Sequence, residues 1–431
     1  MKKLIAISMM IALVAGAAFA QEVSLGFTVE TRMSVSGESS EGNKPAMGGS
    51  VADAYLQASA ANDEGTMGGL VRITQTGAAH RAFVWWKPID QLRVFLGRDN
   101  DGMYTTAHMQ AGWGFHRAGQ GFFNQHSWDY WRTMFPGNWD SFGLALEITP
   151  IEGLAINFVL PLDGVTANYN VAQESGSWTN RAKTFEERFN DIRINVSYEI
   201  PSIGKVIFNY IGSGLPATFS GTENPTGVKP ILYHDGTIGA AFELSAVTGL
   251  DLIAGFGMQL ANRSEKNSPL VIGIAGSYAI TDEFTVKFRG AFEAGGILPM
   301  NNSAAGYVNT STANPWAWHN QNSQAYTKGN AFQFNVMPIY NLGFMEVLLD
   351  VGIRMVMPDA AAIAGWKVAD LGWFINPSFR VPIPGGRFHF GFMANSAETT
   401  TTRYADTAAF YTAGVASVIQ WSIPVGLVFS F

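Results

Sequence analysis

The ten residues from Asp191 to Ile200 read DIRINVSYEI and alternate strictly between polar and apolar side chains. One parity carries only apolar side chains, namely Ile192, Ile194, Val196, Tyr198 and Ile200. Successive side chains of a β-strand point to opposite faces of the sheet, whereas an α-helix would spread this pattern around its circumference. The stretch therefore predicts a strand with one apolar face and one polar face.

The same alternation recurs along the chain and predicts eighteen strands, or sixteen if two short strands are merged. They are expected at 23–35, 51–61, 67–76, 80–87, 92–98, 140–149, 154–162, 189–200, 205–212, 236–245, 250–261, 270–280, 284–294, 330–340, 344–357, 368–381, 387–396 and 411–431. Tight turns rich in Pro, Gly, Asn and Asp alternate with longer connections, so all tight turns fall at one end of the strands. The longest connections are expected at 36–50, 99–139, 163–188, 213–234, 296–328 and 397–408.

The first twenty residues have the features of an export signal. Lys2 and Lys3 precede an apolar run from Leu4 to Val14, and Ala18-Phe19-Ala20 supplies small residues at a cleavage site. We expect residues 1–20 to be removed after Ala20 by the Sec pathway, which leaves residues 21–431 as one domain. Later in the chain no run of 18 apolar residues occurs, so helical membrane spans are not expected.

The composition is poor in charge for a soluble protein. Charged residues make up 14% of the chain, against about 25% in a typical soluble domain. The 13% aromatic content excludes a disordered chain, and the absence of Cys excludes a disulfide scaffold. Strands with one face toward lipid and one toward water explain the low charge, and they place the aromatic side chains mainly on the lipid face and its girdles.

An even strand number, short turns at one end and long loops at the other are typical of bacterial outer-membrane barrels. A barrel in lipid must close, because no water is present to hydrogen-bond a free sheet edge. A soluble β-sandwich or propeller also alternates, but it does not need this asymmetry. The predicted fold is all-β: a closed antiparallel transmembrane β-barrel with short periplasmic turns and long extracellular loops.

The last strand carries a further mark. Its odd positions hold Val415, Ile419, Trp421, Ile423, Val425, Leu427, Phe429 and the terminal Phe431. This pattern resembles the C-terminal strand of Gram-negative outer-membrane proteins, and with the strand number and turn asymmetry the mature chain resembles the porins. The resemblance implies an outer-membrane location among lipids, recognition of Phe431 by the barrel-assembly machinery, and association as a homotrimer. Pro424 predicts a bulge or kink in this strand.

The polar face of the strands is expected to line the bore. The predicted pore-lining residues are Arg72, Arg93, Glu147, Asp191, Arg193, Glu199, Lys205, Lys287, Arg289, Glu293, Asp350, Arg354, Arg380 and Arg387. Mixed charges of this kind would set up a transverse field and an ion preference. Alternatively, many of these side chains pair across neighbouring strands and stiffen the wall.

The segment 99–139 is unusually aromatic for an outer connection, where exposed aromatic side chains would form a costly apolar patch. The third outer loop of porins folds into the barrel, and this segment is similar in order and length. It is therefore predicted to narrow the bore through Asp99, Asp101, His108, Trp113, His116, Arg117, Trp128, Trp131 and Arg132. The alternative is a loop that contacts another subunit or caps the mouth of the barrel.

Several classes of function are not supported by the sequence. No phosphate-binding, nucleophile-elbow or zinc-protease motif occurs, and the spacing of His108, His116 and His126 matches no zinc site. We therefore expect no enzyme activity, metal or other cofactor. The formal net charge of −7 and the absence of basic clusters argue against nucleic acid.

The sequence predicts a porin that admits small hydrophilic solutes or ions by passive diffusion through a water-filled channel. A fatty-acid-type transporter of hydrophobic substrates is one alternative, but that family places an N-terminal hatch in the barrel, and here a strand is expected from Val23. A surface adhesin or structural barrel whose loops bind host molecules is the other.

Overall fold

The computed structural model describes residues 22–39, 45–74, 79–99, 139–162, 169–172, 178–181, 189, 192–212, 237–260, 270–300, 325–358, 372–398 and 417–430. One antiparallel sheet holds β1 (Glu22–Glu38), β2 (Ala46–Ala61), β3 (Met67–Thr74), β4 (Ala79–Ile89), β5 (Leu92–Asp99), β6 (Trp139–Ile151), β7 (Leu154–Pro161), β10 (Arg193–Ile200), β11 (Gly204–Ile211), β12 (Thr237–Leu244), β13 (Leu250–Gln259), β14 (Leu270–Ala279), β15 (Phe284–Met300), β16 (Ala325–Asn341), β17 (Glu346–Pro358), β18 (Gly372–Ile383), β19 (Gly386–Gly391), β20 (Met393–Glu398) and β21 (Ser417–Ser430). A separate hairpin holds β8 (Tyr169–Ala172) and β9 (Trp178–Arg181). None of the helical structure in these ranges is long and apolar enough to cross a membrane.

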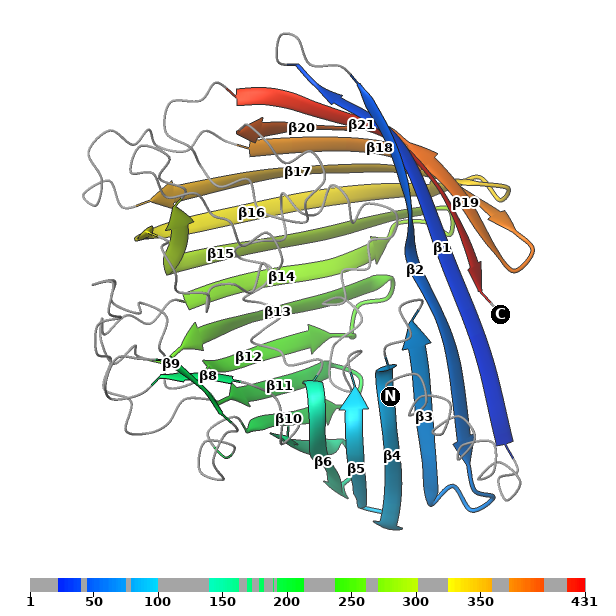
Figure 1. Cartoon of the computed structure of the whole chain (residues 1–431), viewed down its shortest axis with the longest axis vertical. Coiled ribbons are helices and arrows are strands. Elements are labelled where there is room, and N and C mark those ends of the chain that lie inside the picture. The colour runs from blue at the N-terminus through cyan, green and yellow to red at the C-terminus, as the bar shows by residue number, and fades with distance from the viewer. Residues whose placement is uncertain are drawn as a thin grey trace.

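The sheet closes on itself, because each of its strands pairs on both sides. β1 pairs with β2 on one side and with β21 on the other, and the strands run around the ring between them (Figure 1). β19 and β20 both pair with β18 and β21 in one unchanged register, so they are two parts of the same wall strand. The wall is thus a closed antiparallel barrel of eighteen strands, which confirms the predicted fold and its porin-like architecture.

Alternation along each strand gives the barrel two different faces. In β11, Ile207 is 4% exposed and Asn209 is 1% exposed, whereas Phe208 between them is 46% exposed. Residues of one parity share the concave side of a closed sheet, where neighbouring side chains shield one another. The buried parity therefore forms the inner face, and the exposed apolar parity forms the outer face.

The outer face is apolar and carries aromatic side chains near both ends of the strands. At the turn end these are Trp86, Tyr198, Tyr278 and Tyr340, and at the loop end they are Tyr210, Trp373 and Trp421. Aromatic residues gather in this way at the two edges of an apolar belt in membrane barrels. The outer face thus has the pattern of a surface that contacts lipid.

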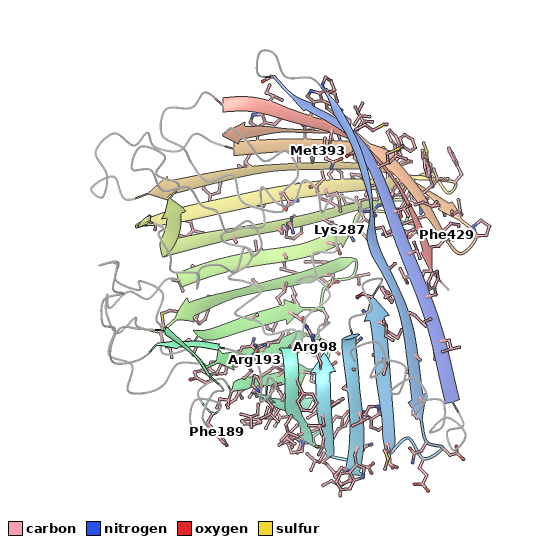
Figure 2. All side chains as sticks on the ribbon, viewed as in Figure 1. Arg98, Phe189, Arg193, Lys287, Met393 and Phe429 are labelled. Atoms are coloured by element: carbon pink, nitrogen blue, oxygen red, sulfur yellow. The ribbon has the colours of Figure 1, made fainter. Side chains whose placement is uncertain are left out.

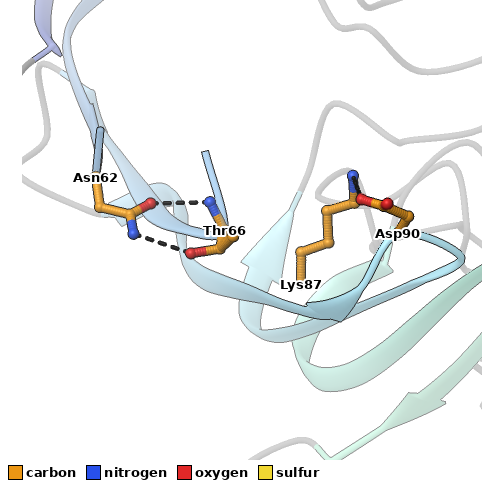
Figure 3. A network of polar contacts seen from close by, with 4 residues as sticks. All are labelled: Asn62, Thr66, Lys87 and Asp90. Carbon is orange, nitrogen blue, oxygen red and sulfur yellow. Dashed lines mark hydrogen bonds and ion pairs between the residues drawn. The ribbon is translucent and has the colours of Figure 1, made fainter. Parts of the chain in front are cut away.

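Local side-chain chemistry fixes the tight turns. Asn62 Oδ1 accepts hydrogen bonds from the Thr66 and Met67 amides, both at 2.9 Å, and Asn62 Nδ2 donates to Thr66 Oγ1 at 2.9 Å (Figure 3). In the next turn at this end, Lys87 Nζ lies 3.0 Å from Asp90 Oδ1. The Lys87 amide donates to the Thr66 carbonyl at 2.7 Å, which ties the two turns together.

Two expected loops are shorter than predicted because their flanking strands continue. β15 and β16 pair as far as Met300 with Ala325, inside the expected loop 296–328, after a register shift between Glu293 and Gly296. β1 and β2 likewise pair into the expected loop 36–50. Backbone pairing does not require alternating side chains, so stretches that lack the polar–apolar alternation extend these strands.

The bulge predicted at Pro424 is absent. The β1–β21 register runs past this residue without a shift, and the pairing of β21 with β19 on one side of Pro424 and with β20 on the other has the same register. Instead the neighbouring wall strand is interrupted at Phe392, between β19 and β20. In this register, the carbonyl group of Gly391 would accept a hydrogen bond from the amide at position 424 of β21. The carbonyl group of Phe392 would accept one from the amide at position 377 of β18. Both positions are proline and have no N–H, so two consecutive carbonyl groups lose their ladder bonds.

Candidate functional site: the inner wall of the barrel

The structure places eleven of the predicted pore-lining residues on the inner face. They are Arg72, Arg93, Glu147, Arg193, Glu199, Lys205, Lys287, Arg289, Asp350, Arg380 and Arg387. In Figure 2, Lys287 lies within the ring of strands, whereas Phe429 projects from its outside. The side chains of the other three, Asp191, Glu293 and Arg354, lie outside the described part of the chain.

In the described part of the chain, pairs of opposite charge bridge neighbouring strands on this face. Each pair has an N–O separation of 3.5 Å, and the pairs are Arg93–Glu147, Lys205–Glu243 and Arg380–Glu346. Their side chains are partly exposed, so solvent screens the attraction and each pair adds little stability. The inner wall therefore offers paired charges that solutes can still reach.

Arg289 and Asp350 are buried within the wall, each with 3% exposure. Arg289 Nε donates to Asn335 Oδ1 at 2.6 Å, and Asn335 Nδ2 donates to Asp350 Oδ1 at 2.8 Å. This chain of hydrogen bonds crosses β15, β16 and β17, and it compensates the cost of burying two charges. These two residues hold strands together, as the alternative interpretation of the sequence expected for some of the charges.

A row of three buried asparagines crosses β7, β10 and β11 on the same face. Asn157 Nδ2 donates to Asn195 Oδ1 at 3.2 Å, and Asn195 Nδ2 donates to Asn209 Oδ1 at 2.6 Å. Each asparagine is directly opposite the next in the ladder. This row could not be predicted from the sequence, because alternation gives the face of a residue but not its partner on another strand.

Arginine and aromatic side chains interleave on the inner face of β2 to β5. The Cζ atom of Arg72 lies 4.3 Å from the ring centroid of Tyr55, that of Arg81 lies 5.4 Å from Phe83, and that of Arg93 lies 5.3 Å from Trp85. Arg72 also donates from Nε and Nη2 to Gln57 Oε1, at 2.9 and 2.6 Å.

The aromatic side chains of this section are exceptions to the expected arrangement. Phe83, Trp85 and Phe95 lie on the inner face, although most aromatic side chains in the described part of the chain lie toward lipid as expected. A signal was present in the sequence: Arg81, Phe83, Trp85 and Lys87 share one parity, and two of these four residues are cations. The parity of the cations identifies the inner side of β4.

Most of the predicted constriction segment lies outside the described residues, which include only its two ends. Of Asp99 only the backbone is described. The other predicted residues of this segment lie outside the described part of the chain; they are Asp101, His108, Trp113, His116, Arg117, Trp128, Trp131 and Arg132. Asp99 and Trp139 are partners in the ladder between β5 and β6. The segment thus leaves and re-enters the wall at one point.

Within the described ranges, no three His, Cys, Asp or Glu side chains are grouped so that they could hold a metal ion. The arrangement on the inner wall is one of charged, amide and aromatic side chains that a passing solute could contact.

No protein-family model and no curated protein sequence matches the chain. Similar solved structures include an anion-selective porin from Comamonas acidovorans, 13% identical over 95% of this chain and 99% of its own, with a TM-score of 0.47. The outer membrane channel DcaP of Acinetobacter baumannii is 9% identical over 95% and 97%, with a TM-score of 0.48. The trimer form of OmpT, an outer membrane protein of Vibrio cholerae, is 13% identical over 95% and 99%, with a TM-score of 0.44.

Proposed function

We propose that this protein is an outer-membrane channel that admits small hydrophilic solutes or ions by passive diffusion. The observation that carries the proposal is the closed wall of eighteen strands with an apolar, aromatic-edged outer face and a charged inner face. The outer face suits contact with lipid, and the inner face suits contact with water. A charged inner face is suited to a water-filled interior, and a water-filled interior can admit polar solutes.

Ion preference would come from the charges that remain accessible on the inner wall. Arg93 retains 41% exposure beside Glu147 at 31%, so both can interact with a passing ion. Arg289 and Asp350 are buried and hydrogen-bonded, so they would contribute mainly to the rigidity of the wall. Selectivity thus depends on part of the charged set.

We further propose that the segment 99–139 narrows the bore. Its support is the pairing of Asp99 with Trp139, which anchors both ends of a long aromatic segment at one point on the wall. Deletion of residues 101–138, with a short glycine linker, is expected to raise single-channel conductance. An unchanged conductance with loss of binding to host molecules would instead favour a surface adhesin.

Export through Sec with cleavage after Ala20, recognition of Phe431 by the barrel-assembly machinery and assembly as a homotrimer belong to the same proposal. Residues 1–20 and Phe431 lie outside the described residues. N-terminal sequencing of the outer-membrane protein and crosslinking in intact membranes would test the cleavage site and the assembly.

The direct test is electrical recording from the purified, refolded chain in planar lipid bilayers. A channel predicts step-like increases in current as single barrels insert. Strand-rich circular dichroism and heat-dependent gel mobility would show that the protein is folded. A folded protein that leaves the bilayer non-conducting would contradict the proposed function.

A further inference from the structure

We propose that the inner wall of β3, β4 and β5 is a binding site for small aromatic carboxylates. This inference rests on the proposed function, because the site lies inside the barrel. It combines two features that such solutes require: aromatic faces for the ring and guanidinium groups for the carboxylate. The residues that carry it are Arg81, Phe83, Trp85, Arg93 and Phe95.

The aromatic part of the site is held flat against the wall. A β-carbon added to Gly68 would come within 2.7 Å of Cε2 and Cζ2 of Trp85, so the indole covers the backbone of Gly68. The indole is therefore in contact with the wall on the side of Gly68. The Arg93 guanidinium lies over the same ring, and Trp85 is only half-buried, so part of the ring beside this cation stays accessible to a ligand. The missing side chain of Gly68 is what allows this placement.

Neighbouring rings fix the position of the indole. Phe95 is paired with Trp85 in the ladder, is buried against Ala145 and Val159, and meets Phe83 edge to face at 5.9 Å between centroids. Phe83 and Trp85 remain half-buried on top of this cluster. A ring that is packed from below loses little freedom when a solute stacks on it, which favours binding.

Cations stand at both ends of the aromatic section. Along β4 the inner-face order is Arg81, Phe83, Trp85 and Lys87, a span of six residues or about 20 Å. Arg93 enters from β5 at the turn side, 5.3 Å from the Trp85 ring and 5.8 Å from the Phe95 ring. A solute that stacks on the rings therefore has a guanidinium beside it on either side.

The chemistry of the ligand follows from this combination. A guanidinium presents a planar fork of donors that matches a carboxylate, and an aromatic face favours another planar ring. Neutral sugars could stack on the rings and accept hydrogen bonds from the guanidinium groups, but they offer no charge and no planar pair of oxygens to them. Simple anions could use the guanidinium groups but not the rings. An aromatic carboxylate uses both.

The test compares three probes of similar size: benzoate, cyclohexanecarboxylate and benzyl alcohol. Binding to the refolded full chain in detergent is measured by calorimetry, and relative permeation is measured in bilayers. Because the stacking contribution requires the aromatic ring, we expect benzoate to bind about fivefold more tightly than cyclohexanecarboxylate. Benzyl alcohol, which lacks the carboxylate, should bind more weakly than benzoate.

Two variants separate the two features of the site. Changing Phe83 and Trp85 to Leu keeps apolar volume, and it should bring the ratio of benzoate to cyclohexanecarboxylate affinity to about one. Changing Arg81 and Arg93 to Gln should remove the preference for benzoate over benzyl alcohol. Trp86→Leu is the matched control, because Trp86 is adjacent to Trp85 but lies on the outer face with 53% exposure, and it should leave both ratios unchanged.

Conduction of potassium chloride by each variant shows that the barrel is intact. A wild-type chain that conducts but binds benzoate and cyclohexanecarboxylate equally would overturn the site while leaving the channel proposal standing. The same conclusion would follow if the Leu variant kept the wild-type ratio. A chain that binds benzoate with the expected preferences but does not conduct would support the site and contradict the channel.

Discussion

At the scale of single residues, the inner wall shows how a polar side chain can be buried inside a barrel. Asn157, Asn195 and Asn209 are at most 5% exposed, and the central asparagine uses its carbonyl for one neighbour and its amide for the other. A buried amide without a partner costs more than the hydrogen bond itself contributes. The three asparagines therefore stabilise one another, and loss of the central Asn195 would remove both hydrogen bonds of the row.

We expect Asn195→Ala to lower the free energy of unfolding by about 1–3 kcal/mol, because it leaves buried groups of Asn157 and Asn209 without partners. Replacing all three asparagines with Ala should cost less than three times this amount, because no half-satisfied partner remains. Urea titrations followed by tryptophan fluorescence in lipid vesicles would measure both. Ser197→Ala, on the same face of β10, is the control, and strictly additive losses would argue against a coupled row.

At the scale of elements, the ladder is interrupted where two prolines flank the same strand. Pro377 on β18 and Pro424 on β21 both face the Gly391–Phe392 segment in the register. The strand nevertheless keeps its register on both sides, because pairing resumes at Met393. A missing donor therefore weakens a barrel strand locally without displacing it.

Pro424→Ala should restore a ladder bond to the Gly391 carbonyl and slow amide hydrogen exchange around β19 and β20. Pro382→Ala is the matched control. The new amide of residue 382 would point toward position 344, opposite it in the β17–β18 register. Because β17 begins only at Glu346, position 344 lies outside the ladder and offers this amide no ladder acceptor. Exchange that is slowed equally in both variants, or in neither, would contradict this account of the interruption.

How far the sequence predicts the molecule also depends on the element. Alternation identified β10 and the strand number, because an apolar outer face requires it. Alternation did not predict the far ends of β15 and β16, because backbone pairing continues there although the side chains no longer alternate. For the site, parity placed Arg93 and Lys205 on the inner face, but it could not show that Asp350 is buried or that Trp85 lies over Gly68, since both depend on neighbouring strands.

At the scale of the whole molecule, each strand has one side suited to lipid and one suited to water. Ile274 lies near the middle of β14 on the outer face with 39% exposure, and Ser277 lies on the inner face of the same strand. The consequence of adding a charge should therefore depend on the face that receives it.

Ile274→Arg is expected to destabilise the barrel in lipid by about 2–4 kcal/mol, because it places a cation in hydrocarbon. Ser277→Arg adds the same charge to the inner face and should cost much less. Equilibrium unfolding in phospholipid vesicles would compare the two variants. Equal losses would mean that the outer face of β14 does not contact lipid.

Closure can be tested at the seam between β1 and β21. Thr28 Oγ1 and Ser430 Oγ lie 3.3 Å apart although they are 402 positions apart in sequence, and the chain has no Cys of its own. We expect Thr28→Cys with Ser430→Cys to form an intramolecular disulfide on mild oxidation, which non-reducing gel mobility would reveal. Thr28→Cys with Ser422→Cys, where position 422 lies eight residues before Ser430 on β21, should not. An absence of crosslinking in the first variant would show that the seam is open.

The pairing of β1 with β21 also has a consequence for the order of events during biosynthesis. The ribosome makes β1 long before its partner β21, because Thr28 and Ser430, which pair with each other, are 402 positions apart. Until β21 has been made, the backbone groups along that side of β1 have no permanent partner, and they could pair with another chain. The barrel therefore cannot close before β21 has been synthesised, and the nascent protein depends on being kept apart from other copies until then.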